Sequence, residues 1–156
     1  MNMNLIGLDK EQSQQLAQSL NHLLANYQVF YMNTRGYHWN IKGKKFFELH
    51  AKFEEIYTDL QTKIDEIAER ILTLGAQPLH SFSSYIENAE IQEHTNVTDG
   101  QNTMQGLVNG FGHLISHQRK VLELATQADD EGTSSQMSDY IREQEKLVWM
   151  LNAWLQ

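Results

Sequence analysis

The sequence has 156 residues, 40% of them apolar, and its 20 acidic and 12 basic residues give a net charge of −8. This length predicts a single domain over residues 1–156, and the negative charge disfavours long-range attraction to nucleic acid phosphates. The absence of cysteine excludes disulfides, thiolate zinc sites and a cysteine nucleophile. No run of 18 apolar residues is present, and no basic region is followed by an apolar run, so we expect neither a membrane span nor a secretory signal. These absences predict a cytoplasmic protein.

The spacing of apolar residues predicts an all-α fold. Residues 1–8 are expected to form a short, loosely held tail. Asp9 is the predicted N-cap of a first helix over 10–39, with Gln12 as the second member of a capping box. A stripe at three- and four-residue spacing marks the buried face of this helix: Leu16, Leu20, Leu23, Leu24, Tyr27, Tyr31 and Thr34.

A second helix is predicted over 46–74, after a turn over 40–45. Gly75 follows as a C-terminal stop, since glycine readily adopts the left-handed conformation that ends a helix. The connection over 76–98 is long for a compact domain, so we expect a short helix within it, over 83–88.

A third helix is predicted over 100–128, capped by Thr98 or Asp99. An acidic turn over 129–132 follows, and Thr133 with Gln136 repeats the capping-box pattern before a last helix over 134–155. The glycines in the first half of the third helix lower its intrinsic propensity and would permit another helix to pack closely: Gly106, Gly110 and Gly112.

Four long helices with one long crossover fit a ferritin-like four-helix bundle better than a simple up-and-down bundle. The crossover between the second and third helices lets those two run parallel. We therefore predict this bundle with a short extra helix inside the crossover.

Two histidines and two carboxylates form a candidate metal site. Asp65 and Glu69 are four residues apart and lie on one helix face, and His50 is rotated from Asp65 by only about 60°. His38 continues the stripe of the first helix. Imidazole and carboxylate together suit iron. One subunit offers few ligands, and the Glu-x-x-His motif of ordinary ferritins is absent, so a second subunit is a natural source of the rest.

These residues resemble the Dps family, the DNA-binding proteins from starved cells, also called mini-ferritins. The resemblance covers nearly the whole chain and is carried by YHWN at 37–40, by His50, and by DEIAER at 65–70. The spacings of 12, 15 and 4 residues between the four ligand candidates fit the family pattern.

The resemblance implies a hollow homododecamer with di-iron ferroxidase centres at its two-fold interfaces. His38 and His50 would come from one subunit, and Asp65 and Glu69 from its symmetry mate. Fe(II) would be oxidised there, preferentially by hydrogen peroxide, and ferric mineral would be stored in the cavity.

The family pattern suggests roles for further residues. Trp39 would lie beside the centre and intercept stray oxidising equivalents, or would serve as an interface anchor. Glu54 and Glu55 would nucleate mineral on the inner surface, or would be plain solvated charges. Acidic residues near the last helix would line a three-fold pore that admits Fe(II): Asp129, Asp130 and Glu131.

Some members of the family instead compact nucleoid DNA, usually through a flexible basic tail. Here the first nine residues contain no Lys or Arg and the last three are Trp-Leu-Gln, so DNA binding is the disfavoured alternative. His113 and His117 have a spacing that can chelate a divalent metal, but no family motif supports them, and surface or packing roles are the alternative.

Overall fold

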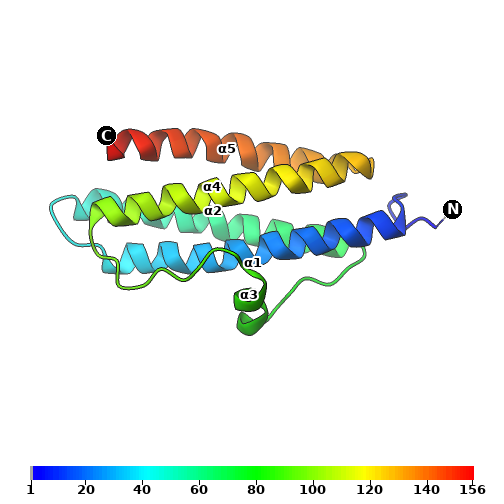
Figure 1. Ribbon diagram of the computed structural model, residues 1–156, viewed down its shortest axis with the longest axis horizontal. Helices are drawn as coiled ribbons and strands as arrows, with labels where there is room; N and C mark the ends of the chain where they lie inside the picture. The colour runs from blue at the N-terminus through cyan, green and yellow to red at the C-terminus, as the bar shows by residue number, and fades with distance from the viewer. Residues whose placement is uncertain (1) are drawn as a thin grey trace.

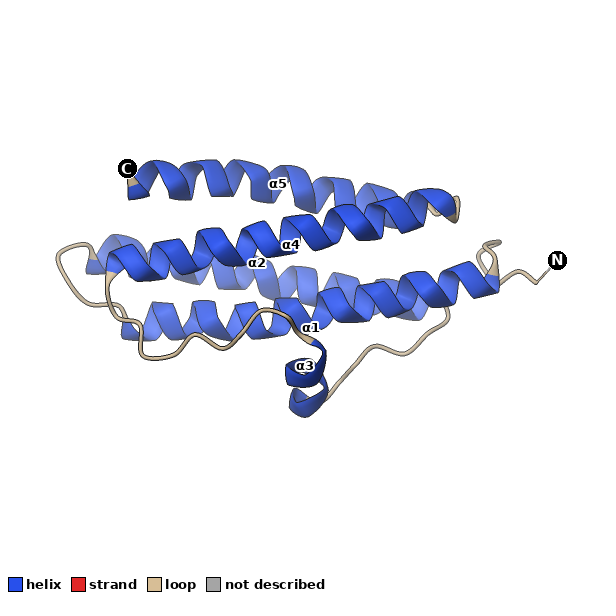
Figure 2. Ribbon diagram, in the orientation of Figure 1, coloured by secondary structure: helices blue, strands red, loops and turns tan. Residues whose placement is uncertain are grey.

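The computed structural model describes residues 2–156, so Met1 of the predicted tail lies outside the described residues. Over that range the chain is helical without a regular strand (Figure 2). None of its helices is long and apolar enough to cross a membrane. The helices are α1 (Lys10–Asn40), α2 (Phe46–Thr73), α3 (Phe82–Asn88), α4 (Gly100–Gln127) and α5 (Glu131–Leu155).

The four long helices form a bundle of two antiparallel hairpins, α1 with α2 and α4 with α5 (Figure 1). The crossover that contains α3 carries the chain back along the bundle, so that α2 and α4 run in the same direction. The predicted bundle, the short extra helix and the parallel pair are therefore confirmed.

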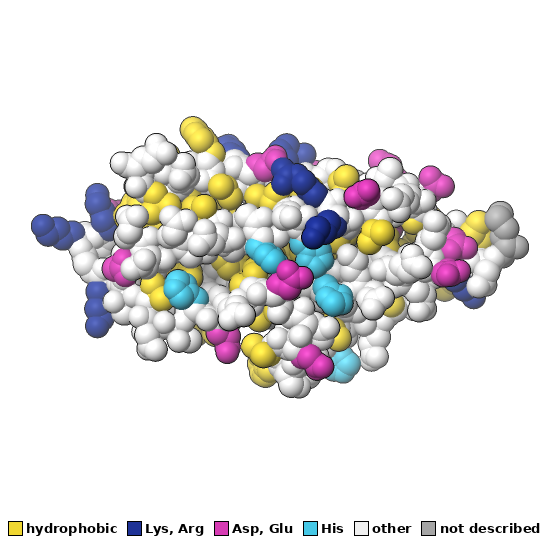
Figure 3. All heavy atoms as spheres, in the orientation of Figure 1, with side chains coloured by type: hydrophobic (Ala, Val, Ile, Leu, Met, Phe, Trp, Pro, Cys, Tyr) yellow, Lys and Arg dark blue, Asp and Glu magenta, His cyan; other side chains and the backbone are white. Residues whose placement is uncertain are grey.

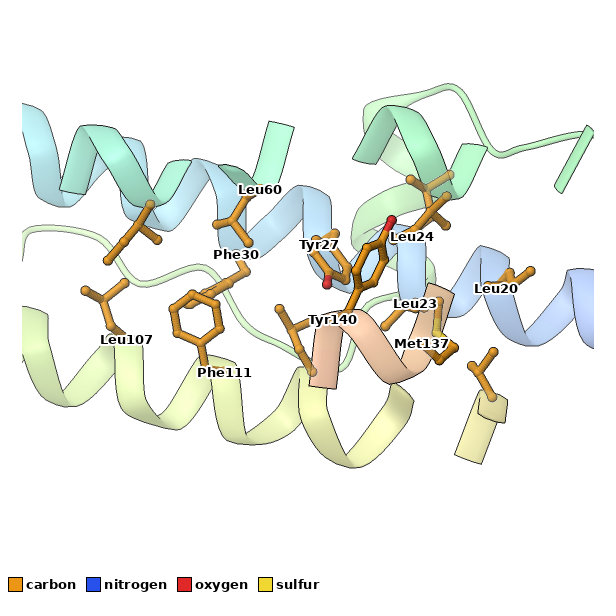
Figure 4. Close-up of a cluster of buried hydrophobic side chains, with 14 of the residues drawn as sticks. Leu20, Leu23, Leu24, Tyr27, Phe30, Leu60, Leu107, Phe111, Met137 and Tyr140 are labelled. Atoms are coloured by element: carbon orange, nitrogen blue, oxygen red, sulfur yellow. The ribbon is translucent and has the colours of Figure 1, made fainter. Parts of the chain in front are cut away.

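The core lies between the four long helices and is filled by large apolar side chains. Phe30 of α1 and Phe111 of α4 meet edge to face, with ring centroids 4.9 Å apart (Figure 4). Such aromatic pairs add about 0.5–1.5 kcal/mol to the energy of their burial. The predicted stripe of α1 is buried except for the half-buried Tyr31.

Of the three glycines singled out in the sequence of α4, two are required by close contact with α1. A Cβ at Gly110 would collide with the ring of Phe30, and a Cβ at Gly106 would collide with the hydroxyl of Tyr37. A Cβ at Gly112 would meet no atom within 4 Å, so this glycine does not contribute to the close approach. Sequence periodicity leaves open which helix packs against Gly106 and Gly110. The structure shows that this helix is α1.

The N-terminal tail is held more firmly than predicted. Met3 and Asp9 form an isolated antiparallel bridge, and the amide of Lys10 donates to the carbonyl of Asn2 at 2.9 Å. The side chain of Asn4 accepts from the Leu8 amide at 2.9 Å and donates to Ser13 Oγ at 3.1 Å. The prediction of a loose tail is wrong for residues 2–8, because these local hydrogen bonds fasten the turn to α1.

The predicted caps are only partly correct. Asp9 and Asp99 cap α1 and α4, each accepting a bond from the amide three residues on. The Gln12 side chain reaches Gln127 rather than the Asp9 amide, so the capping box is incomplete. Thr133 is not the cap of α5: Asp130 is, and its carboxylate accepts from the Thr133 amide at 3.0 Å.

Candidate metal centre

The hairpin between α1 and α2 brings His38 and His50 together. His38 lies in the last turn of α1, and His50 lies in the second turn of α2. Gly43 has φ +117°, a conformation that favours glycine and allows the short reversal between the helices. The two imidazole rings stack with centroids 3.8 Å apart and planes 12° apart.

Each histidine is oriented by the backbone of the other. His38 Nδ1 lies 2.6 Å from the carbonyl oxygen of His50, and His50 Nδ1 lies 2.7 Å from that of His38. A carbonyl can only accept, so each Nδ1 carries the hydrogen and donates it. In the neutral ring the lone pair is then on Nε2, the tautomer that a metal ligand needs.

The carbonyl of His38 is available for this bond because it stands at the end of α1. The last carbonyls of a helix have no partner within the helix. The amide of Lys42, which would ordinarily bond to His38, donates instead to Thr98 at 2.8 Å. The helix end therefore supplies the acceptor that fixes the ring of His50.

Glu54 places a carboxylate oxygen next to the histidines. Its Oε1 lies 3.6 Å from His38 Nε2, and its side chain is 61% exposed while that of His38 is only 7% exposed. Glu54 lies one helical turn after His50, and this i,i+4 spacing indicates that the two side chains lie close together. The sequence analysis instead gave Glu54 a role in mineral nucleation.

Aromatic side chains surround the histidine pair. Tyr57 contacts His38 edge to face at 5.3 Å, and Phe46 stacks on His50 at 4.9 Å. Trp39 is 55% exposed, and the guanidinium of Arg35 lies 4.7 Å from its ring. The site is thus a stacked pair of imidazoles flanked by aromatic rings, with His38 buried.

Asp65 and Glu69 do not reach the histidines of the same chain. Both are exposed on α2, and at 1.5 Å per residue they lie about 22 and 28 Å further along the helix axis than His50. Within residues 2–156 no group of three or more metal-ligating side chains converges. The four predicted ligands therefore lie in two separate places on one subunit.

Comparison with known proteins gives consistent matches over nearly the full length. A model of the ferritin-like domain matches residues 17–156. An uncharacterized protein of Haemophilus influenzae is 58% identical over 98% of this chain and 96% of its own length. A protein of Porphyromonas gingivalis named "DNA protection during starvation protein" is 41% identical over 97% of this chain and 96% of its own length.

Solved structures show the same similarity in three dimensions. The crystal structure of the Dps protein from Vibrio cholerae O1 is 73% identical, covers 100% of this chain and 98% of its own, and superposes with a TM-score of 0.99. It is described as a member of a broad superfamily of ferritin-like diiron-carboxylate proteins. The chain belongs to the Dps family. The family prediction is confirmed.

The acidic residues proposed for the Dps pore have different surroundings. Asp129 and Glu131 are exposed, and Asp129 adopts φ +56°. Asp130 is only 2% exposed, and its Oδ1 accepts from Arg70 at 2.7 Å while it caps α5. Because its carboxylate is buried and paired, Asp130 stabilises the fold and does not present a charge to solvent in this subunit.

The proposed nucleation residues are both exposed on α2. Glu55 pairs with Lys52 at 3.5 Å, and such an exposed pair contributes little to stability. Glu54 instead lies next to the histidine pair. Their positions are thus compatible with a solvated surface, and only Glu54 stands beside the candidate centre.

Proposed function

We propose that this Dps protein is a ferroxidase that oxidises Fe(II), preferentially with hydrogen peroxide, and stores the ferric product in a hollow homododecamer. The observation that carries this proposal is the histidine pair locked by reciprocal bonds to backbone carbonyls, with both Nε2 atoms left for a metal. His38 and His50 would hold the substrate iron together with Asp65 and Glu69 of a second subunit, with Glu54 as a further oxygen ligand.

A two-fold axis can bring the half-sites together. Residues 50 and 65 of α2 are equidistant from positions 57–58. If two copies of α2 cross antiparallel at that point, His50 of each lies opposite Asp65 of the other. This is an isologous contact, so one interface completes two identical sites. Exposed apolar side chains on α1 and α2 would be covered by such a contact: Met32, Trp39 and Leu72.

The ligand types suit the proposed reaction. Imidazole nitrogen and carboxylate oxygen bind iron, and the carboxylates offset the charge that increases when Fe(II) becomes Fe(III). Two substrate Fe(II) ions would each give one electron to hydrogen peroxide. With two protons from solvent, cleavage of its O–O bond would yield two water molecules and two Fe(III) ions, without a hydroxyl radical. Trp39 beside His38 would intercept a stray oxidising equivalent, or would anchor the interface through its exposed ring.

Iron entry and iron storage would take place at other surfaces of the shell. Asp129 and Glu131 would attract cations at a three-fold pore, since a ring of carboxylates focuses the electric field. Asp130 is left out of that group because of its pairing with Arg70. Glu55, with Glu54, would offer carboxylates to the growing mineral.

The test is a complementation experiment in mixed shells. One variant lacks the nitrogen ligands (His38→Ala with His50→Ala), and the other lacks the carboxylates (Asp65→Asn with Glu69→Gln). Each alone should lose fast Fe(II) oxidation in stopped-flow measurements with peroxide. Coexpressed in equal amounts, they should regain about a quarter of the parent burst, because random pairing makes one shared site in four intact.

Shells assembled separately and mixed after purification are the control and should remain inactive. A parent-like rate in either variant alone would rule out the ligand set. Inactivity of coassembled shells that contain both variants would show that the site is not shared between subunits. Repeating the parent reaction with dioxygen tests the preference for peroxide.

DNA binding is the alternative function, because several relatives are named for DNA protection. Such protection would also follow from removing iron and peroxide, without contact with DNA. The net charge of −8 does not favour direct binding.

A further inference from the structure

A second group of histidines gathers on the other side of α1 from the candidate centre. One pocket is lined by His22 of α1, Glu90 of the crossover, and His113 and His117 of α4, with Ser116 and Lys120 at its border. Figure 3 shows histidines clustered around a carboxylate near the middle of this face. The sequence prediction considered only His113 and His117, because the other two residues are distant along the chain.

The two histidines of α4 are placed to act together. His113 and His117 are four residues apart on one helix, so their side chains project on the same face one turn apart. Two histidines at this spacing on a helix form a recurrent chelating unit for zinc. His113 Nε2 already lies 3.4 Å from Glu90 Oε2, which brings an oxygen ligand to the same pocket.

The crossover is held in position at this point. The amides of Glu90 and Ile91 each donate to Asn26 Oδ1 at 2.8 Å, and Asn26 is fully buried. The Nδ2 atom of the same Asn26 side chain donates to the carbonyl of His22 at 2.8 Å. Asn26 therefore connects the backbone of Glu90 to that of His22, and it fixes both residues at the edge of the pocket.

We propose that His22, Glu90, His113 and His117 form a binding site for one borderline divalent ion of the zinc class, separate from the proposed ferroxidase centre. Three imidazoles and a carboxylate are ligands that such ions accept in tetrahedral geometry. Within residues 2–156 no three of these side chains yet converge on one point. His113 and His117 would bind first, and Glu90 and His22, which are exposed, would rotate to complete the coordination.

The bound ion would clamp the crossover to the bundle. Its ligands come from α1, the crossover and α4, so binding joins three segments that otherwise meet through hydrogen bonds. Zn²⁺ should therefore slow hydrogen exchange at the amides of Glu90 and Ile91, because opening the crossover would require release of the ion.

The test uses Zn²⁺ titration by calorimetry on full-length shells. A background of His38→Ala with Asp65→Asn removes ligands from both halves of the proposed centre, so the Zn²⁺ that remains reports the pocket. This background should bind one Zn²⁺ per subunit at the pocket, and Glu90→Gln should weaken the affinity at least about tenfold. His113→Ala with His117→Ala should abolish binding. His80→Ala, an exposed histidine outside the pocket, is the matched control and should change nothing.

Glu90→Gln keeps the test decisive if the double histidine variant fails to assemble, because the Glu90 side chain is 72% exposed and its replacement does not disturb the core. Unchanged affinity in Glu90→Gln, together with unchanged exchange at residues 90 and 91 when Zn²⁺ is added, would overturn the proposal. Equal losses of binding in His80→Ala and in the pocket variants would overturn it too, since such binding would be non-specific.

Discussion

At the scale of single residues, the environment of a side chain decides its chemistry more than its type does. His38 and His50 donate through Nδ1 to each other's carbonyl oxygens, so Nε2 remains for a ligand. His94 instead uses Nδ1 to contact the hydroxyl of Tyr37 at 2.5 Å. Of these three histidines, only His38 and His50 form a stacked pair in which both Nδ1 atoms donate to backbone carbonyls.

We predict that the protein loses stability at alkaline pH as the phenol of Tyr37 ionises. Burial raises its pKa from 10.0 to about 12. In the unfolded chain the phenol ionises from about pH 10, whereas the folded chain keeps it neutral to about pH 12. The contribution of Tyr37 to the free energy of unfolding is therefore complete below pH 10. This contribution, about 2–3 kcal/mol in total, is lost as the pH rises from 10 to 12.

Thermal unfolding followed by circular dichroism at pH 8, 10 and 11 measures this effect. The Tyr37→Phe variant should show a smaller fall in melting temperature between pH 8 and 11 than the parent. Parallel curves for the two proteins would contradict the assignment. Burial also raises the pKa of Tyr27 and Tyr140, so a residual alkaline loss is expected in the variant.

At the scale of the helices, the start of α5 depends on a contact with α2. Arg70 donates to Asp130 Oδ1 at 2.7 Å and to Thr133 Oγ1 at 2.9 Å. A Cβ at Gly132 would collide with this guanidinium, so glycine leaves the space that Arg70 occupies. The ion pair and the N-cap thus share one carboxylate.

Replacing Asp130 by Ala should destabilise the protein by about 3 kcal/mol, because it removes a helix cap and leaves the largely buried Arg70 without its partner. Chemical denaturation at neutral pH measures the difference. Asp129→Asn is the control: the residue is exposed, and asparagine tolerates φ +56°, so stability should change by less than about 0.5 kcal/mol. Equal losses in both variants would contradict the distinct role of Asp130.

At the scale of the whole molecule, the isolated subunit exposes more surface than a monomer of its size. Its accessible area is 8872 Å², whereas a monomeric protein of this mass exposes roughly 8,100 Å². Large apolar side chains lie exposed at several places along the chain: Met32, Trp39, Phe47, Leu72, Phe82, Ile86, Trp149 and Trp154. Such exposure marks surfaces that assembly would cover.

We therefore expect light scattering after size exclusion to give the mass of twelve 18.1 kDa subunits. The physical reason is the combination of exposed apolar surface with half-sites that one chain cannot complete. A stable monomer, or a shell of 24 subunits, would refute the dodecamer. Trp39→Glu should weaken assembly if this ring anchors the interface, whereas Glu55→Gln at an exposed pair should leave the mass unchanged.

DNA binding should be weak at neutral pH and physiological salt. Six of the twelve basic residues face carboxylates within the subunit: Lys45, Lys52, Lys63, Arg70, Arg119 and Arg142. This pairing halves the number of basic side chains that are free to displace counterions from phosphates. A gel-shift assay checks this, and tight, salt-sensitive retention would overturn the prediction and direct attention to Lys42, Lys44 and Lys45.

The sequence by itself determined the helices and the family, because helical periodicity and motif spacing are local properties of the chain. The length of the crossover also indicated that α2 and α4 run parallel. Only the tertiary structure decided which residue caps α5. Asp130 and Thr133 are both suitable caps by type, and the choice of Asp130 depends on Arg70, sixty residues earlier.

The same limit applies to the sites. Spacing placed His50, Asp65 and Glu69 on one helix face, but only the folded hairpin shows the histidines fixed by each other's carbonyls and Glu54 beside them. The grouping of His22 and Glu90 with the α4 histidines required the crossover to fold across α1. Contacts between segments far apart in sequence depend on packing and on loop paths, and neither has a period that can be seen in the chain.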